Sequence, residues 1–140
     1  MARRVLVDTG PIVALLDRRD THHEWAKKEL ANLQQPLLTC EAVISETFFL
    51  LGTVRGGVEA FCGLLKHGLV QPDPEFSYGA SAAQVLDSLF RYRDLPMTFA
   101  DACLLKMSEM RRDCLVFTTD GDFLTYRRYR RERIPLISPF

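Results

Sequence analysis

Four acidic residues of this sequence are placed where carboxylates can act together: Asp8, Glu46, Asp101 and Asp120. Asp8 and Asp120 each follow a short apolar segment that is typical of a buried strand. Because the carboxyl ends of parallel strands meet at one edge of a sheet, we expect these two acids to lie close together. Clustered carboxylates raise one another's pKa unless a cation lies between them. An all-oxygen acidic site suits Mg²⁺ or Mn²⁺, ions that activate water and offset charge on a phosphoryl group.

Three of these acids also have an ordinary structural explanation. Asp8 fits an Asx-turn or a helix N-cap ahead of Pro11. Asp120 precedes a glycine, and Asp-Gly is a common turn. Asp101 stands three residues after Thr98, a spacing that predicts a variant capping box. Taken one at a time, these residues favour structural roles.

Glu46 is harder to explain without function. On a helix it shares a face with Val43, Phe49 and Leu50. A lone carboxylate on an apolar face costs several kcal/mol unless it is paired, protonated or bound to a metal. For Glu46, a functional role is therefore favoured over a structural one.

The elements that must position these acids alternate along the chain. Strands are expected at 5–7, 37–40, 69–70, 114–118 and 134–137, and helices at 11–17, 21–35, 41–53, 58–66, 81–93 and 98–112. A short helix is expected to begin near Gly121, and 127–133 fits poorly as a paired strand. The alternation predicts a single α/β domain over 1–140, with a central parallel sheet of four or five short strands flanked by helices on both faces.

The composition is ordinary for a globular protein, with 47% hydrophobic and 26% charged residues. The formal net charge is zero, so no overall field draws the chain to nucleic acid or membrane, and binding must come from local patches. Four cysteines without a C-x-x-C pair predict buried free thiols in a reducing compartment. No long apolar run or leader-like segment is present, which predicts a cytoplasmic protein that does not bind membranes.

The ordered motifs resemble the PIN-domain nucleases, and among them most closely the VapC-type toxins of toxin–antitoxin pairs. The matching segments are Val7-Asp8-Thr9-Gly10-Pro11, Ser45-Glu46, Phe99-Ala100-Asp101-Ala102 and Phe117-Thr118-Thr119-Asp120-Gly121-Asp122-Phe123. They span nearly the whole chain in the right order. The resemblance implies metal-dependent cleavage of RNA by a PIN-like fold.

The resemblance also implies roles for individual residues and partners. Asp8, Glu46, Asp101 and Asp120 would be catalytic and hold Mg²⁺ or Mn²⁺, Thr118 would support a phosphate or a metal-bound water, and Asp122 would be an auxiliary acid. A homodimer, a small antitoxin protein and a structured RNA target follow from the same resemblance.

The densest basic segment has two explanations. Its arginines are Arg127, Arg128, Arg130, Arg131 and Arg133, interleaved with Tyr126 and Tyr129. Arginines and tyrosines in this arrangement can contact RNA phosphates and stack on bases, with Arg127, Arg128 and Arg130 as the first candidates. The same run also fits a solvated helix end whose cations complement the helix dipole.

Other functions remain open at this point. Val7-Asp8-Thr9-Gly10 matches the active-site triplet of retroviral-type aspartic proteases, but the helical spacing over most of the chain disagrees with that all-β fold. A PIN scaffold that binds RNA or a protein without cutting is the serious alternative. A purely structural role for all four acids is the third.

Overall fold

A five-stranded parallel sheet lies at the centre of the protein, whose computed structural model describes residues 3–140. The strands are β1 (Val5–Val7), β2 (Leu37–Thr39), β3 (Val70–Pro72), β4 (Leu115–Phe117) and β7 (Leu136–Ile137). Their order in the sheet is β3-β2-β1-β4-β7. In the central strand, Leu6 lies opposite Leu38 on one side and Val116 on the other. β1 and β2 are fully buried, which explains why they read as unbroken apolar runs.

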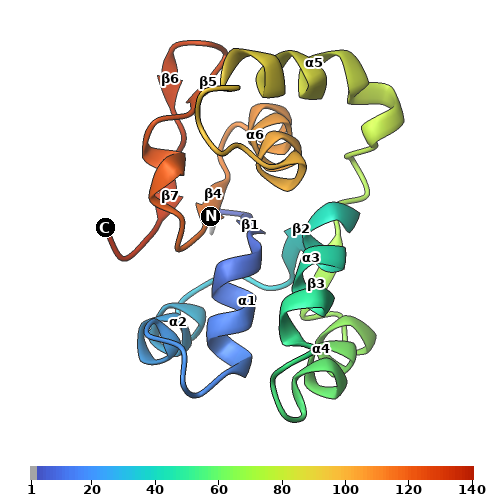
Figure 1. The fold of residues 1–140 in the computed structure, drawn as a ribbon, viewed down its shortest axis with the longest axis vertical. Coiled ribbons are helices and arrows are strands. Elements are labelled where there is room, and N and C mark those ends of the chain that lie inside the picture. The colour runs from blue at the N-terminus through green and yellow to red at the C-terminus, as the bar shows by residue number, and fades with distance from the viewer. Residues whose placement is uncertain (1–2) are drawn as a thin grey trace.

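Six α-helices cover the sheet. They are α1 (Thr9–Leu16), α2 (His23–Leu30), α3 (Glu41–Leu51), α4 (Gly57–Lys66), α5 (Tyr78–Arg91) and α6 (Phe99–Met110). Figure 1 shows α5 and α6 on one side of the sheet and α1, α2 and α4 on the other. Eight of the twelve residues of α6 are buried, because this helix packs between the sheet and α5. The predicted α/β class, the parallel sheet and the helices on both faces are confirmed.

The ends of two helices differ from the sequence prediction. α2 begins at His23 rather than at Thr21, because the Asp20 carboxylate accepts a hydrogen bond from the His22 amide and continues the turn. The same helix ends at Leu30, before the residues that lead to β2. α5 begins at Tyr78, three residues before the expected start.

The arginine-rich segment forms a small hairpin, so the prediction that 127–133 does not pair was wrong. It follows the 3₁₀ helix η1 (Gly121–Leu124) and consists of β5 (Arg127–Arg128) and β6 (Glu132–Arg133), which are antiparallel. Tyr129 and Arg130 have positive φ angles of 50° and 69°. Two left-handed residues in succession match the right-handed twist of a tight hairpin, although neither residue is a glycine.

Cys40, Cys62, Cys103 and Cys114 are free thiols, and all except Cys62 are buried. Within residues 3–140, no helix combines the length and the apolar character needed to cross a lipid bilayer.

Candidate active site

Two strand ends bring the first and last acids to the same edge of the sheet. The Asp8 amide donates to the carbonyl of Phe117 at 3.0 Å, which ties the end of β1 to the end of β4. The Thr118 hydroxyl donates to Asp8 Oδ2 at 2.7 Å and accepts a hydrogen bond from the Asp120 amide at 3.0 Å. Asp8 and Asp120 are therefore linked through one buried hydroxyl.

The structural roles considered for these acids are also present, and they hold the carboxylates in place. Asp8 is the N-cap of α1, and its Oδ1 accepts from the Thr9 amide at 2.8 Å. Asp101 and Thr98 form a reciprocal capping box at the start of α6. Asp120 Oδ1 accepts from the Asp122 amide at 2.9 Å, at the start of η1. These hydrogen bonds hold Asp8, Asp101 and Asp120 in place, so their structural roles are compatible with a functional role.

Gly10 allows the loop after β4 to approach the start of α1. A Cβ atom at this position would lie 2.0 Å from Oγ1 of Thr119, far inside van der Waals contact. Only a residue without a side chain leaves room for the loop that carries Asp120. The glycine of the Asp8-Thr9-Gly10 triplet is therefore explained by packing at the site.

Glu46 comes to the site from α3. The side chain is half-buried, and burial raises its pKa, with further contributions from the charges of Asp101 and Asp120. The expected apolar face around Glu46 is only partly formed: Val43 is buried, but Phe49 is 80% exposed. Glu46 therefore borders solvent on one side and the carboxylate cluster on the other.

The cluster concentrates negative charge in a buried place. Burial raises the pKa of Asp8 to about 7, and the charges of Asp101 and Glu46 add to this effect, although hydrogen bonds from Thr118 and Thr9 oppose it. Burial likewise raises the pKa of Asp101, with Asp120 as a contributing charge. The charged neighbours that shift these pKa values are themselves carboxylates. Such a site is stabilised by a bound cation.

The donor set fits an open, hydrated ion site better than a closed cage. In the part of the chain that the structure describes, no three His, Cys, Asp or Glu side chains are arranged to enclose a metal ion. Mg²⁺ is commonly held by one or two carboxylates, while water and substrate oxygens complete its coordination. The four carboxylates influence one another's charge but do not converge on a single point. This arrangement matches the open coordination of Mg²⁺.

Tyr126 belongs to the acidic site, whereas the sequence had offered it only as a ring that could stack on RNA bases. The side chain is fully buried, and its hydroxyl donates to Asp101 Oδ2 at 3.0 Å. Its ring packs edge-on against Tyr92 and Phe123. Because 25 residues separate Tyr126 from Asp101, only the folded chain reveals this contact.

Thr118 and Asp122 have different surroundings. Thr118 is fully buried, and its hydroxyl is engaged by both Asp8 and the Asp120 backbone. Its proton is thus used to position Asp8, and its support of a phosphate or a metal-bound water stays a prediction. Asp122 is half-buried in η1, and its charge contributes to raising the pKa of Tyr126.

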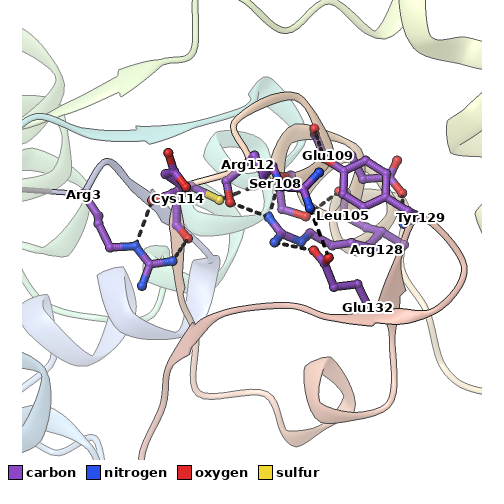
Figure 2. Close-up of polar contacts among 10 residues, drawn as sticks. Arg3, Leu105, Ser108, Glu109, Arg112, Cys114, Arg128, Tyr129 and Glu132 are labelled. Carbon is purple, nitrogen blue, oxygen red and sulfur yellow. Dashed lines mark hydrogen bonds and ion pairs between the residues drawn. The ribbon is translucent and has the colours of Figure 1, made fainter.

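The structure contradicts the prediction that Arg128 binds RNA. Only 4% of Arg128 is exposed, and Figure 2 shows its guanidinium turned toward the end of α6. It donates to the carbonyls of Ser108 and Arg112 at 3.0 and 2.9 Å and pairs with Glu132 Oε2 at 2.7 Å. Arg128 therefore anchors the hairpin to the helix. The alternative of a solvated helix end was also wrong, because the segment is a hairpin.

The other two arginine candidates lie nearer the surface. Arg127 Nη1 donates to the carbonyls of Leu124, Thr125 and Tyr126, which closes the end of η1. Arg130 is exposed, and its guanidinium pairs with Asp87 on α5 at 3.1 Å.

An open groove adjoins the carboxylates. It is lined by Ala42, Ser45, Glu46, Phe49, Thr98, Phe99 and Ala100 and has a volume of about 480 Å³. The rings of Phe49 and Phe99 are 80% and 43% exposed, so they offer apolar faces beside a strongly acidic site.

The parallel α/β fold excludes the all-β architecture of a retroviral-type protease.

The model of the PIN domain family matches residues 5–129. Among solved structures, the fold is similar to that of VapC20 from Mycobacterium tuberculosis, a Sarcin-Ricin loop cleaving toxin. The TM-score is 0.73 at 22% identity, over 84% of this chain and 91% of that chain. No curated protein sequence matches the chain. With its four carboxylates at the edge of a five-stranded parallel sheet, the chain belongs to the PIN domain family.

Proposed function

We propose that this protein is a metal-dependent endoribonuclease of the VapC type that hydrolyses RNA phosphodiester bonds. The observation that carries the proposal is the convergence of Asp8, Glu46, Asp101 and Asp120, whose charges act on one another at a single edge of the sheet. A structural role alone does not explain why a fold would bury carboxylates without cationic partners.

Asp8, Asp101 and Asp120 would hold the ion, Mg²⁺ or Mn²⁺. When bound, the ion would supply Lewis-acid chemistry: it lowers the pKa of water and offsets charge on the phosphate. The protein's own groups orient the acids, since Thr118 and the Thr9 amide fix Asp8 while Tyr126 and the capping box fix Asp101. Glu46, with a raised pKa and a solvent-facing side, is the acid best placed to exchange a proton during hydrolysis. Asp122 is an auxiliary acid.

RNA is the substrate that the surroundings favour. The groove beside Glu46 exposes Phe49 and Phe99, and aromatic faces stack on unpaired bases. Arg127 and Arg130 belong to the hairpin that follows η1, where they can contact phosphates. The similar fold of VapC20, a toxin that cleaves the sarcin-ricin loop, favours a structured RNA as the target.

The same likeness extends the proposal to partners. We infer a toxin of a VapBC-type pair that acts in the cytoplasm as a homodimer and is inhibited by a small antitoxin protein. Exposed apolar side chains on α3 and α5, among them Phe49, Leu86 and Phe90, provide surface for such contacts.

The test compares RNA cleavage by the wild type and Asp8→Asn with Mg²⁺, with Mn²⁺ and with EDTA. Glu59→Gln is the matched control, because Glu59 is exposed on α4 and its change also removes one negative charge away from the carboxylate cluster. We expect cleavage that requires the ion, persists in Glu59→Gln and falls at least about a hundredfold in Asp8→Asn.

Two results would contradict the proposal. Cleavage that Asp8→Asn leaves undiminished would place the activity elsewhere. Failure of the wild type to cleave any structured RNA, together with no heat on calorimetric titration with Mn²⁺, would favour the binding scaffold without catalysis.

A further inference from the structure

A second cavity lies where β1 and β4 begin, at the opposite edge of the sheet from the carboxylates. Its volume is about 480 Å³. Four arginines line it, Arg3, Arg4, Arg111 and Arg112, together with Met110 and Cys114. We call this cavity the arginine pocket. Arg4 and Asp8 are four residues apart on an extended strand, so the pocket lies about 13 Å from the carboxylate cluster.

Two of the arginines are fixed by the fold. Arg3 Nε and Nη2 donate to the carbonyls of Asp113 and Cys114, each at 2.9 Å, and Figure 2 shows this fork at the start of β4. Arg111 donates to both carboxylate oxygens of Asp73 at 2.8 Å. Side chains held in this way lose little freedom when a ligand binds.

The other two arginines keep unused hydrogen-bonding capacity. Arg4 Nε is buried and has no hydrogen-bond partner within residues 3–140. The side chain of Arg112 is 72% exposed, and its guanidinium approaches Glu132 only to 3.6 Å. Because the protein leaves Arg4 Nε itself out of reach, a ligand with several acceptor oxygens would bind the terminal nitrogens of Arg4 and Arg112.

The charges and the lining of the pocket indicate which class of ligand it would bind. Two carboxylates stand against the four arginines in the lining, Glu75 and Asp113, and Glu75 is already paired with Arg111 at 3.2 Å. A guanidinium group matches the geometry of a phosphate and can donate two parallel hydrogen bonds to its oxygens. Met110 is 41% exposed and offers an apolar, polarisable surface. The volume falls within the range of small-ligand sites.

We propose that the arginine pocket binds a nucleotide, with its phosphate on Arg4 and Arg112 and its base against Met110. The nucleotide is either a free molecule or one residue of an RNA strand, because both present the same phosphate and base. The proposal does not depend on cleavage, since none of the four acids lines the pocket.

The experiment is calorimetric titration of the full-length protein in EDTA with 5′-AMP, with adenosine and with inorganic phosphate. Arg4→Gln and Arg112→Gln remove one charge each and keep most of the side-chain stem. Arg18→Gln is the matched control, because Arg18 is exposed and lies outside the lining. Circular dichroism and thermal melting of each variant without ligand establish that it folds.

We expect 5′-AMP to bind more tightly than phosphate, adenosine to bind least, and added salt to weaken binding. Each pocket variant should weaken 5′-AMP about tenfold, while Arg18→Gln binds like the wild type. A short RNA oligonucleotide that competes with 5′-AMP on Asp8→Asn protein would identify an RNA strand as the source, whereas binding of 5′-AMP alone would identify a free nucleotide.

Three results would overturn the proposal: no heat with 5′-AMP, equal affinity for adenosine and 5′-AMP, or unchanged affinity in Arg112→Gln. Because Arg112 is largely exposed, loss of folding does not account for a result with that variant. All titrations are made in EDTA, so these outcomes are independent of whether the protein cleaves RNA.

Discussion

The two edges of the same sheet carry opposite charges, and they are built in different ways. At the carboxyl edge, Asp8, Asp101 and Asp120 follow a strand or lie in the first turn of a helix, and each carboxylate accepts a hydrogen bond from nearby backbone. At the amino edge, arginines from two separate segments are held by carbonyls and by Asp73, across sequence separations of up to 111 residues. The acidic edge is therefore encoded locally, whereas the basic edge depends on the packing of the whole domain.

This difference has a consequence for stability. Burial, and to a smaller extent repulsion between the carboxylates, disfavours the charged form of Asp8 in the absence of a cation, so the acidic edge opposes folding, as the raised pKa of Asp8 shows. Arg111, which lines the arginine pocket, forms a nearly buried ion pair with Asp73 that supports folding. Variants at the two edges should accordingly separate activity from stability.

The largest expected effect is loss of activity in Asp101→Asn. The change removes one charge from the ion-binding cluster and keeps the shape of the side chain, so RNA cleavage should fall about a thousandfold. Binding of 5′-AMP at the arginine pocket should not change, because Asp101 is not in its lining. Cleavage assays and calorimetry on the same preparation measure both effects. A parallel loss of nucleotide binding would show that the two edges are not independent.

Asp73→Asn should have the largest effect on stability. Its side chain is 2% exposed and accepts two hydrogen bonds from Arg111, so the substitution should cost about 2 kcal/mol at pH 7. Asp87→Asn is the control, since this half-exposed acid pairs with Arg91 and Arg130 at the surface and should cost well under about 1 kcal/mol. Urea unfolding measures both values, and equal costs would contradict the assignment.

The same pair predicts a pH dependence. Burial acts to raise the pKa of Asp73, but hydrogen bonds from Arg111 and from the Glu75 amide, together with the charges of Arg111 and Arg4, outweigh it and hold the pKa below its ordinary value. The folded protein binds this proton less readily than the unfolded chain. The pair therefore stabilises the fold above about pH 4, and this contribution is lost as the pH falls through the folded pKa. Urea unfolding between pH 7 and pH 3 should show that the free energy of unfolding falls less steeply with decreasing pH in Asp73→Asn than in the wild type.

Gly10→Ala should damage the acidic edge through packing alone. The new Cβ would clash with Thr119, so we expect a cost of about 2 kcal/mol and a marked loss of cleavage as the loop carrying Asp120 shifts. Gly63→Ala is the control, because no atom lies within 4 Å of the added Cβ inside α4. That substitution should be neutral or stabilise by up to about 1 kcal/mol. Thermal melting distinguishes the two variants.

Phe49→Ala tests the groove beside Glu46. If the exposed ring stacks on an RNA base, the KM for RNA should rise about tenfold with little change in kcat. Phe90→Ala removes an aromatic ring that is 68% exposed on α5 and lies outside the groove. Steady-state kinetics should show no change for this control. An equal rise in KM for both variants would indicate a nonspecific effect of surface hydrophobicity.

Tyr126→Phe should have the smallest effect. It removes the hydroxyl that donates to Asp101, so Mn²⁺ affinity and cleavage should fall severalfold, at a cost in stability of about 1 kcal/mol. Tyr129→Phe removes a hydroxyl of the hairpin that donates to the Glu109 carbonyl of α6 and should leave Mn²⁺ affinity unchanged. Calorimetric titration with Mn²⁺ makes the comparison. Unchanged affinity in Tyr126→Phe would limit that residue to a role in the core.

The order of elements and the four acids could be predicted because the signals are local. Apolar runs predict buried strands, helical spacing predicts the helices, and Asp8, Asp101 and Asp120 stand where a strand ends or a helix begins. The parallel sheet with helices on both faces follows from the alternation of these elements. Glu46 stood out because a carboxylate interrupted an apolar helical pattern, although Phe49 on that face proved to be exposed.

Only the tertiary structure decided the roles of the arginines and of Tyr126. Charge in the sequence does not reveal whether a guanidinium faces solvent, so Arg128 was predicted to bind RNA, whereas it is buried against α6. The contact of Tyr126 with Asp101 and the assembly of the arginine pocket join segments far apart in the chain. Burial and long-range hydrogen bonds depend on how the layers pack, and no short window of sequence contains that information.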